Sequence, residues 1–253
     1  MPLNLNDIER YSRNILLPEI GGEGQKKLLE SKVLVVGAGG LGSPLLMYLA
    51  ASGIGNLTVI DNDKVELSNL QRQIIHTTRF INEQKVMSAK NYLYNINPSI
   101  NVIAINDRLN KKNIKRLIKD QDVIADGSDN FDTRYLIADN CFLYKKILVS
   151  AAINKFEGQI STWKNDPSNL PCFRCLFPKK PNDIDIQNCS NTGVLGSVGG
   201  FLGSLQATEV IKEILCIGES LAGNLNIYDL LNNNFRKIKI NKDPNCIFCN
   251  NAS

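Results

Sequence analysis

The sequence lacks any concentrated basic segment. Its 29 basic and 25 acidic residues leave a net charge of only +4, and the basic residues are scattered, with short pairs such as Lys111-Lys112 and Lys179-Lys180. Nucleic-acid-binding domains instead gather lysine and arginine on one face or along one helix. The charge pattern therefore argues against nucleic-acid binding. With 43% apolar and 21% charged residues, the chain has the composition of an ordinary soluble globular protein.

The sequence also lacks an apolar leader and a long apolar run. Residues 1–14, MPLNLNDIERYSRN, are polar and charged where a signal peptide would carry an apolar core, so we expect a cytoplasmic protein. The uncharged stretch from Cys189 to Thr208 contains several polar side chains and is ended by Glu209. It falls short of the roughly 20 predominantly apolar residues of a membrane span. It predicts instead a buried, glycine-rich helix packed closely on a sheet.

Short β-branched runs alternate with helical segments through the first 155 residues. Strands are predicted at 32–37, 56–61, 100–106, 121–127 and 147–152, and helices at 43–55, 82–97, 111–120 and 132–146. This alternation favours an α/β fold, a Rossmann-like doubly wound sheet that is mostly parallel. Pro44 suits the first turn of its helix, and Gly53 or Gly55 suits its end.

From Glu157 the pattern changes. GQISTWKND, at 158–166, is typical of an antiparallel strand, and GNLNIYDL with NFRKIKI predicts a hairpin joined through LNNN at 231–234. No compositional linker divides the chain. We therefore predict a single domain over 1–253, with a helical lead (1–30), a nucleotide-binding half (31–155) and a carboxyl-terminal half (156–253).

The stretch KVLVVGAGGLGSPLLMYL, residues 32–49, contains a G-x-G-x-x-G motif formed by Gly37, Gly39 and Gly42. Such a turn between a strand and a helix lets the backbone approach a phosphate at the helix amino terminus. Asp61, 24 residues after Gly37, stands where a ribose hydroxyl would be bound; alternatively, it only caps the turn DNDKVE. The motif alone is compatible with a nicotinamide, a flavin or another adenine nucleotide.

The residues after the second strand favour ATP. LSNLQRQ places Asn69, Gln71 and Arg72 near the nucleotide edge of the sheet, and Lys85 stands near the start of the next helix. A pyrophosphate can be held by a helix terminus alone, whereas a triphosphate, with about four negative charges, calls for cationic clamps. Arg72 and Lys85 would supply them.

A group of aspartates follows the fourth predicted strand, in ADGSDNFDTR. Asp126, Asp129 and Asp132 fall in one short loop that should face the same crevice as the glycine motif. Mg²⁺ is usually held by one or two carboxylates plus substrate phosphates, and Asp129 is the expected ligand. Capping of the next helix is the alternative role, expected for Asp132.

The seven cysteines include two C-x-x-C pairs. Cys172 with Cys175 and Cys246 with Cys249 supply four thiolates, which form a closed tetrahedral zinc site. In a reducing cytoplasm, zinc is favoured over two disulfides. With no open coordination position, this zinc would be structural and would tie the carboxyl-terminal tail to the loop after residue 170. Cys141 and Cys216 stand in apolar helical context and are predicted to lie in the core.

Several motifs in this order resemble the MoeB/ThiF group, bacterial relatives of ubiquitin-activating enzymes. They are GAGGLGS, LTVIDNDKVELSNLQRQ, QKV, DGSDN, CFRC and CIFC, and the resemblance extends from RYSRNILLPEIG at residue 10 to the last cysteine pair. The resemblance implies adenylation of the carboxyl-terminal glycine of a small ubiquitin-like sulfur carrier, MoaD-like or ThiS-like, with ATP and Mg²⁺ and release of pyrophosphate. The nucleotide site it implies consists of Gly37, Gly39, Gly40, Gly42, Asp61, Ser68, Asn69, Leu70, Gln71, Arg72, Lys85, Asp129 and Asn130.

The resemblance carries further expectations. Arg13 matches an arginine that reaches into the partner subunit's site, which implies a homodimer with two composite sites. Cys189 matches a cysteine that forms covalent intermediates in some relatives; a loop cysteine without chemistry is the alternative. Because the sequence ends just after the zinc cysteines, we expect no appended sulfurtransferase domain and a separate sulfur donor. The motifs NLTVIDNDKVELSNLQRQIIH and EGQISTW resemble the molybdopterin branch slightly more than the thiamine branch.

Two other functions remain open at this point. A nicotinamide-dependent oxidoreductase fits the glycine motif, but it requires a catalytic proton donor, and His76, the only histidine, is interpreted as structural. A non-catalytic dimeric interaction protein could keep the same fold. A glycine carboxylate is already ionised near neutral pH, so adenylation needs alignment and charge neutralisation and no general base.

Overall fold

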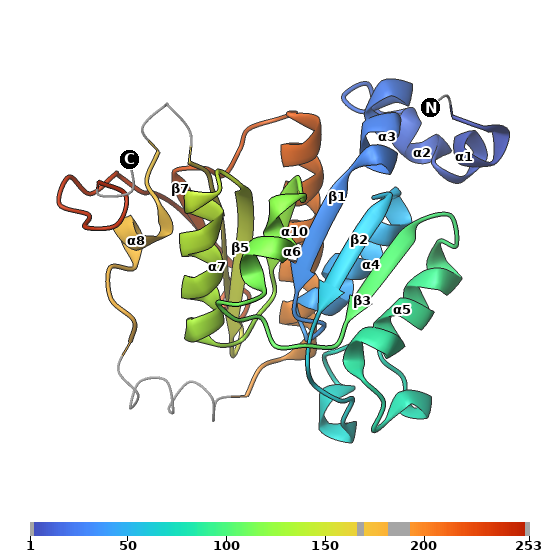
Figure 1. The fold of residues 1–253 in the computed structure, drawn as a ribbon, viewed down its shortest axis with the longest axis horizontal. Coiled ribbons are helices and arrows are strands. Elements are labelled where there is room, and N and C mark those ends of the chain that lie inside the picture. Colours follow the sequence, from blue (N-terminus) through green and yellow to red (C-terminus); the bar gives the residue numbers. More distant parts are fainter. Residues whose placement is uncertain (1–2, 166–169, 182–192, 251–253) are drawn as a thin grey trace.

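The computed structural model describes residues 3–165, 170–181 and 193–250 (Figure 1). Its centre is an eight-stranded sheet with the strand order β3-β2-β1-β4-β5-β6-β7-β8. The strands are β1 (Lys32–Val36), β2 (Asn56–Ile60), β3 (Asn101–Ile105), β4 (Val123–Asp126), β5 (Ile147–Asn154), β6 (Glu157–Trp163), β7 (Asn224–Asp229) and β8 (Asn234–Lys239). The predicted α/β class is confirmed.

The helices connect and cover these strands. They are α1 (Leu5–Arg10), α2 (Ser12–Ile15), α3 (Gly21–Glu30), α4 (Gly42–Ser52), α5 (Lys85–Ile96), α6 (Ile114–Lys119), α7 (Phe131–Leu143), α8 (Phe173–Leu176) and α10 (Gly196–Leu215), with 3₁₀ turns η1 (Leu67–Asn69) and η2 (Thr78–Phe80). In the described part of the chain, no helix combines the length and apolarity needed to cross a membrane.

The sheet is parallel in one half and antiparallel in the other. β3, β2, β1, β4 and β5 run parallel, as helical crossovers require. The chain then reverses tightly at Lys155, whose φ of 53° is left-handed, and β6, β7 and β8 pair antiparallel. The predicted antiparallel strand is confirmed as β6, which ends at Trp163, and the predicted hairpin at 223–240 is confirmed as β7 and β8.

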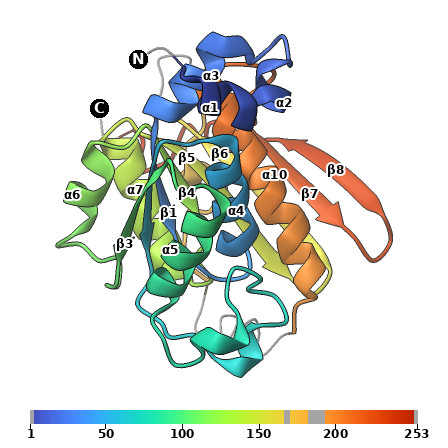
Figure 2. The ribbon, with the colours of Figure 1, turned by 90° about the vertical axis from the view of Figure 1, so that its right-hand side faces the viewer.

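Two apolar layers lie on opposite faces of the sheet (Figure 2). In β1, Val33 and Val35 belong to the apolar layer that includes α4, α5 and α10, whereas Leu34 and Val36 belong to the layer that includes α6 and α7. Successive strand residues point to opposite faces, so a strand covered on both sides becomes apolar throughout. This explains the uninterrupted run KVLVV.

α10 lies against α4 as well as against the sheet. A methyl group on Gly203 would collide with the Leu41 carbonyl, and one on Gly199 would lie 2.8 Å from the Gly40 carbonyl oxygen. Glycine at these positions therefore permits direct backbone contact between the two helices. The predicted glycine-rich buried helix is confirmed, and its amino-terminal half lies beside the glycine motif.

Element ends differ from the predictions for local reasons. α5 begins at Lys85 rather than 82, because Asn82 has a left-handed φ of 72°. α6 begins at Ile114 rather than 111, because the Asn110 side chain accepts from the Lys112 N–H and stabilises a turn. α4 ends at Gly53, which has a φ of 87°.

Candidate functional site

The glycine motif forms a tight loop between β1 and α4. Gly37 has a φ of 93°, and a side chain on Gly42 would collide with the Gly37 carbonyl. The Gly127 carbonyl oxygen, from the loop after β4, would lie only 3.0 Å from a methyl group on Gly37. The loops after β1 and β4 are therefore in contact at the carboxyl edge of the sheet.

Asp61, directly after β2, holds this loop. Its Oδ2 accepts from the Ala38 N–H at 2.8 Å, and its Oδ1 accepts from the Asp63 N–H at 2.8 Å. A carboxylate offers about four acceptor positions, so these bonds leave capacity for a ribose hydroxyl. The structure thus shows that Asp61 holds the loop in shape. Its expected role in binding the ribose stays a prediction.

Arg72 lies directly over the glycine loop. A methyl group on Gly40 would be 3.4 Å from Arg72 Cγ, and Arg72 Nη1 donates to the Ser68 carbonyl at 3.1 Å. The Gln71 carbonyl lies against Gly196, where a side chain would collide with it. Arg72 therefore joins the glycine motif and the start of α10 in one cluster.

The other residues of LSNLQRQ have different surroundings. Asn69 is buried and its Oδ1 accepts from the Glu66 N–H at 3.2 Å, which caps η1. Ser68 and Gln71 are exposed, and Leu70 is half-buried. The segment thus carries exposed polar groups on a locally capped turn.

Lys85 reaches the same edge from the first turn of α5. Its Nζ lies 2.8 Å from Asp63 Oδ2, and its side chain is only 7% exposed. A buried ammonium needs a paired anion, and Asp63 provides it. The sequence prediction placed Lys85 near the nucleotide but missed Asp63, although its position two residues after Asp61 could have indicated it.

The three aspartates after β4 have separate environments. Asp126 is buried, and burial raises the pKa of its carboxyl group, while Arg134 and the Ser128 N–H oppose that shift. Asp132 is exposed and pairs with Lys180 at 2.7 Å. Asp129 is exposed, which leaves it the most accessible of the three.

The predicted capping role of Asp132 is wrong. Asn130 caps α7, because its Oδ1 accepts from the Thr133 N–H at 2.9 Å. Asn130 was expected in the nucleotide site, and it does lie at that edge.

Gln206 is a site neighbour that the sequence did not reveal. From α10, its Nε2 donates to the Asp126 carbonyl at 2.9 Å and to the Val149 carbonyl at 3.0 Å. It thereby ties α10 to the carboxyl end of β4 and to the neighbouring strand β5. Because Asp126 is 80 residues away along the chain, no local pattern could have paired them.

Arg13 does not belong to this cluster. It lies exposed on α2, next to α3, which leads directly into the amino end of β1 (Figure 1). The glycine loop lies at the opposite end of β1. Within one chain, Arg13 is therefore remote from the other predicted site residues.

Replacing Gly42 with alanine is expected to lower both stability and nucleotide affinity, because the new methyl group collides with the Gly37 carbonyl. Overpacking of this kind costs about 1–3 kcal/mol of the free energy of unfolding, which denaturant unfolding would measure. Gly22→Ala, in α3 with nothing within 4 Å of the added carbon, is the control. Equal stability of both variants would contradict the close approach.

The two C-x-x-C pairs converge into one cluster. The Sγ atom of Cys172 lies 3.8 Å from the Sγ of Cys175 and 3.7 Å from the Sγ of Cys246. The Sγ atoms of Cys175 and Cys249 are 3.7 Å apart. All four sulfurs lie within 4.8 Å of one another. Four sulfurs held tetrahedrally at 2.3 Å from a zinc ion are about 3.8 Å apart. The geometry therefore fits a four-cysteine metal site.

Electrostatics differ between the cysteines of the cluster. Burial raises the pKa of Cys172 and raises that of Cys249 to about 11. Burial opposes ionisation of Cys246 as well, yet the backbone N–H groups of Cys249 and Phe248 donate to its sulfur and lower its pKa. Backbone donors aimed at sulfur are a feature that stabilises bound thiolates.

The segment that bears the first cysteine pair is fastened along α7. Arg174 makes two hydrogen bonds with Asp139, at 2.9 and 2.7 Å, and lies 4.3 Å from the centre of the Tyr135 ring. The Tyr135 hydroxyl donates to the Lys179 carbonyl at 2.7 Å. The cysteine cluster thus joins the carboxyl-terminal tail to the helix that starts at the nucleotide edge.

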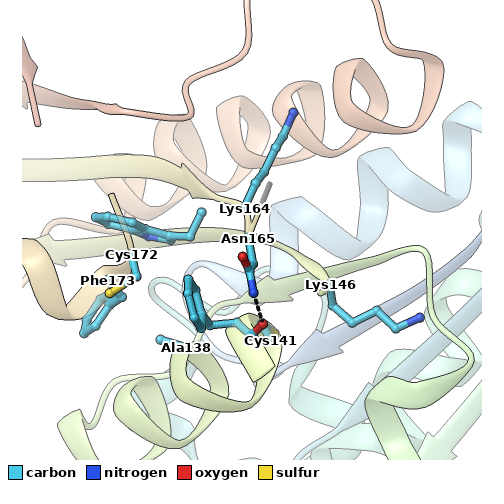
Figure 3. A pocket seen from close by; sticks show the side chains of 9 residues that line it. Ala138, Cys141, Lys146, Lys164, Asn165, Cys172 and Phe173 are labelled. Atoms are coloured by element: carbon cyan, nitrogen blue, oxygen red, sulfur yellow. Dashed lines mark hydrogen bonds between the residues drawn. The ribbon is translucent and has the colours of Figure 1, made fainter. Parts of the chain in front are cut away.

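A small cavity beside the cluster is not a substrate site. It is lined by Cys141, Cys172 and Phe173, among others, and its volume is about 10 Å³ (Figure 3). Such a volume holds one water molecule at most. Across it, Asn165 donates to the Phe142 carbonyl at 2.9 Å.

The remaining cysteines differ in their surroundings. Cys141 is buried, as predicted. Cys216 is exposed, so its predicted core position is wrong: it caps the end of α10 with a φ of 57°. Cys189 lies outside the described residues.

Taken together, the fold and the glycine loop with its cationic and acidic neighbours define a nucleotide-binding α/β enzyme. The model of the ThiF family matches residues 11–248, and the chain therefore belongs to the ThiF family. This confirms the resemblance drawn from the sequence. Its curated relatives are named adenylyltransferases or activating enzymes, and the chain is accordingly an adenylyltransferase.

Two relatives match almost end to end. The SAMP-activating enzyme E1 of Haloferax volcanii is 44% identical over 98% of this chain and 91% of its own length. The sulfur carrier protein adenylyltransferase of Thermus thermophilus is 42% identical over 96% of this chain and 91% of its own. The maize adenylyltransferase and sulfurtransferase MOCS3-1 is 46% identical over 97% of this chain, which spans 52% of that relative.

Solved structures support the fold. The crystal structure of E. coli MccB with AMPCPP and MccA has a TM-score of 0.83 and 25% identity, over 96% of this chain and 75% of that one. PaaA has a TM-score of 0.81 at 24% identity, over 96% and 76%. The fold of this chain is therefore similar to the folds of MccB and PaaA.

Proposed function

We propose that the protein adenylates the carboxyl-terminal glycine of a small ubiquitin-like sulfur-carrier protein, using ATP and Mg²⁺ and releasing pyrophosphate. The observation that carries this proposal is the cluster at one sheet edge of the glycine loop, Arg72 and the exposed Asp129. The names of the two end-to-end relatives, which refer to SAMP and to a sulfur carrier protein, support the substrate class.

The chemistry follows from charge and position. The carrier carboxylate attacks the α-phosphorus, and its oxygen–phosphorus bond forms as the bond to pyrophosphate breaks. Arg72 and Lys85 neutralise the triphosphate. Lys85 must then either bind a phosphate and Asp63 together or leave Asp63 for the phosphate. Asp129 would supply a carboxylate ligand for Mg²⁺, which would help to neutralise the charge on the phosphates. Fixed opposite charges of this kind account for several kcal/mol of barrier lowering.

The test is exchange of labelled pyrophosphate into ATP. We expect exchange only when the carrier is present with its carboxyl-terminal glycine intact, and none with a carrier lacking that residue. An oxidoreductase would instead bind NAD tightly and show no exchange, and a non-catalytic interaction protein would bind the carrier without exchange. Comparing MoaD-like and ThiS-like carriers in this assay would distinguish molybdopterin from thiamine synthesis.

We also propose a homodimer in which Arg13 enters the partner subunit's site. Arg13 is exposed on α2, and Figure 1 shows α2 beside α3, which leads into the amino end of β1, away from the glycine loop. This position supports a role across subunits. A covalent role for Cys189 belongs to the same proposal, and a loop cysteine without chemistry remains the alternative.

Mixing two inactive variants would test the composite site. Arg13→Ala and Arg72→Ala should each lack exchange activity, but hybrid dimers contain one site with both arginines intact. We expect mixing, after subunit exchange, to restore up to about a quarter of wild-type activity, since random pairing makes half the dimers hybrid, each with one good site of two. No recovery, with dimers forming normally, would place Arg13 in its own chain's site or outside both.

The four cysteines are proposed to hold a structural zinc. Four buried or half-buried sulfurs lie within 4.8 Å of one another; they would complete a tetrahedral zinc shell and leave no position open for substrate. The ion would fix the tail to the segment along α7, away from the adenylation chemistry.

A further inference from the structure

His76 is buried between the glycine loop and α5. Its Nε2 lies 2.9 Å from the Ala38 carbonyl oxygen, and its Nδ1 lies 2.9 Å from Ser88 Oγ. A carbonyl oxygen can only accept, so Nε2 carries the proton and donates to Ala38. The Ser88 hydroxyl then donates to Nδ1 and fixes this tautomer.

The charge state of His76 agrees with this pattern. Burial lowers the pKa of the imidazole, the bond to Ala38 opposes that shift, Lys85 on α5 lowers the pKa further, and Asp61 after β2 raises it. The ring is therefore neutral near pH 7, which leaves one nitrogen as donor and the other as acceptor.

Two consecutive peptide groups of the glycine loop are each held by a hydrogen bond to a side chain, one from Asp61 and one from His76. Asp61 accepts from the Ala38 N–H, and His76 donates to the Ala38 carbonyl. Because a trans peptide is planar, its N–H points away from its C=O. Fixing the Ala38 carbonyl toward His76 therefore points the Gly39 N–H to the other side of the loop.

The Gly39 N–H is free to bind a ligand. Among residues 3–165, 170–181 and 193–250, no group accepts from the N–H of Gly39 or Gly40, and both glycines are partly exposed. Unpaired N–H groups next to a helix amino terminus favour phosphate oxygens.

We infer that His76 is a positioning residue of the nucleotide site: it holds the Ala38 carbonyl so that the Gly39 N–H is directed at a phosphate of the nucleotide. This inference rests on the proposed use of ATP. His76 touches neither substrate nor metal in this role, and it acts through the loop backbone alone.

Two substitutions separate this role from simple core packing. His76→Gln keeps a donor at the reach of Nε2 and can still bind the Ala38 carbonyl. His76→Asn keeps an amide near Ser88 but falls short of Ala38. Loss of one neutral hydrogen bond corresponds to roughly fivefold in an equilibrium constant.

We expect His76→Asn to weaken binding of the ATP analogue AMPCPP about fivefold, to raise KM for ATP in exchange by a similar factor and to leave KM for the carrier unchanged. His76→Gln should restore most of the affinity. If both fail to fold, Ser88→Ala, which frees the ring to rotate, should give a smaller loss with the same ATP-only pattern. Equal ATP affinity of wild type and His76→Asn, or equal losses in the Asn and Gln variants, would overturn the inference.

The outcomes also distinguish this inference from the proposed function. AMPCPP binding by the wild type without carrier-dependent exchange would contradict carrier adenylation, yet the binding comparison would still decide the role of His76. A wild type that binds no AMPCPP would overturn both.

Discussion

Replacing Asp129 with alanine is expected to reduce carrier-dependent pyrophosphate exchange by about 100- to 1,000-fold, the usual effect of removing one preorganised group that stabilises developing charge. The Asp129 side chain is exposed at the edge of the loop after β4. Its removal should leave the thermal unfolding temperature unchanged. Added Mg²⁺ should recover part of the activity, because a weakened metal site is filled at higher metal concentration.

Asp132→Ala provides the matched control. Asp132 is also an exposed carboxylate on the same short segment, but it pairs with Lys180 at 2.7 Å. Exposed pairs of this kind contribute about 1 kcal/mol or less, so this variant should exchange nearly normally. Equal losses in both variants would remove the metal role from Asp129.

Arg72 offers an independent check on the same site. Arg72→Ala should lose exchange to a similar degree, and Arg72→Lys should recover only part of it, because lysine keeps the charge but lacks the planar fork that binds two phosphate oxygens. If Asp129→Ala and Arg72→Ala both exchanged at wild-type rates, the adenylation site would have to lie elsewhere.

The parts of the site that the sequence predicted share a physical origin. Gly37, Gly42, Asp61 and Asp129 each follow a strand whose β-branched run is visible in the sequence, and parallel strands bring their carboxyl ends to one edge. The contact between Gly127 and the glycine loop is what that rule implies. The four cysteines were predictable because their spacing alone is typical of a metal site.

Other features depended on three-dimensional packing. The bonds from His76 to Ala38 and from Gln206 to Asp126 join residues 38 and 80 positions apart, and no local pattern encodes them. Cys216 was misplaced because apolar neighbours predict burial in a helix, whereas this residue lies at the helix end, in a left-handed conformation that directs it outward.

Replacing Cys249 with serine is expected to have the largest effect on stability. The substitution removes one of the four converging thiolates. Cys249 lies in the carboxyl-terminal tail, and its Sγ is 3.7 Å from the Sγ of Cys175. Loss of a structural metal is among the few changes that cost about 4 kcal/mol or more. For a chain of this size, that corresponds to a fall of roughly 10 °C in the unfolding temperature.

Zinc content and unfolding should change together in this variant. Metal analysis should show about one zinc per chain in the wild type, as a closed tetrahedral site requires, and far less in Cys249→Ser. Cys216→Ser is the control, because Cys216 is exposed and lies outside the cluster. A chelator should lower the wild-type unfolding temperature toward that of Cys249→Ser and leave the variant unaffected, since metal binding and folding are coupled.

Unchanged zinc stoichiometry in Cys249→Ser would rule out the four-cysteine site, and unchanged stability after zinc loss would separate the metal from the fold. ATP binding should persist in the variant at temperatures below its unfolding, because Arg72 and Asp129 lie on the loops after β2 and β4, whereas the cysteine cluster packs against Phe142 and Phe248.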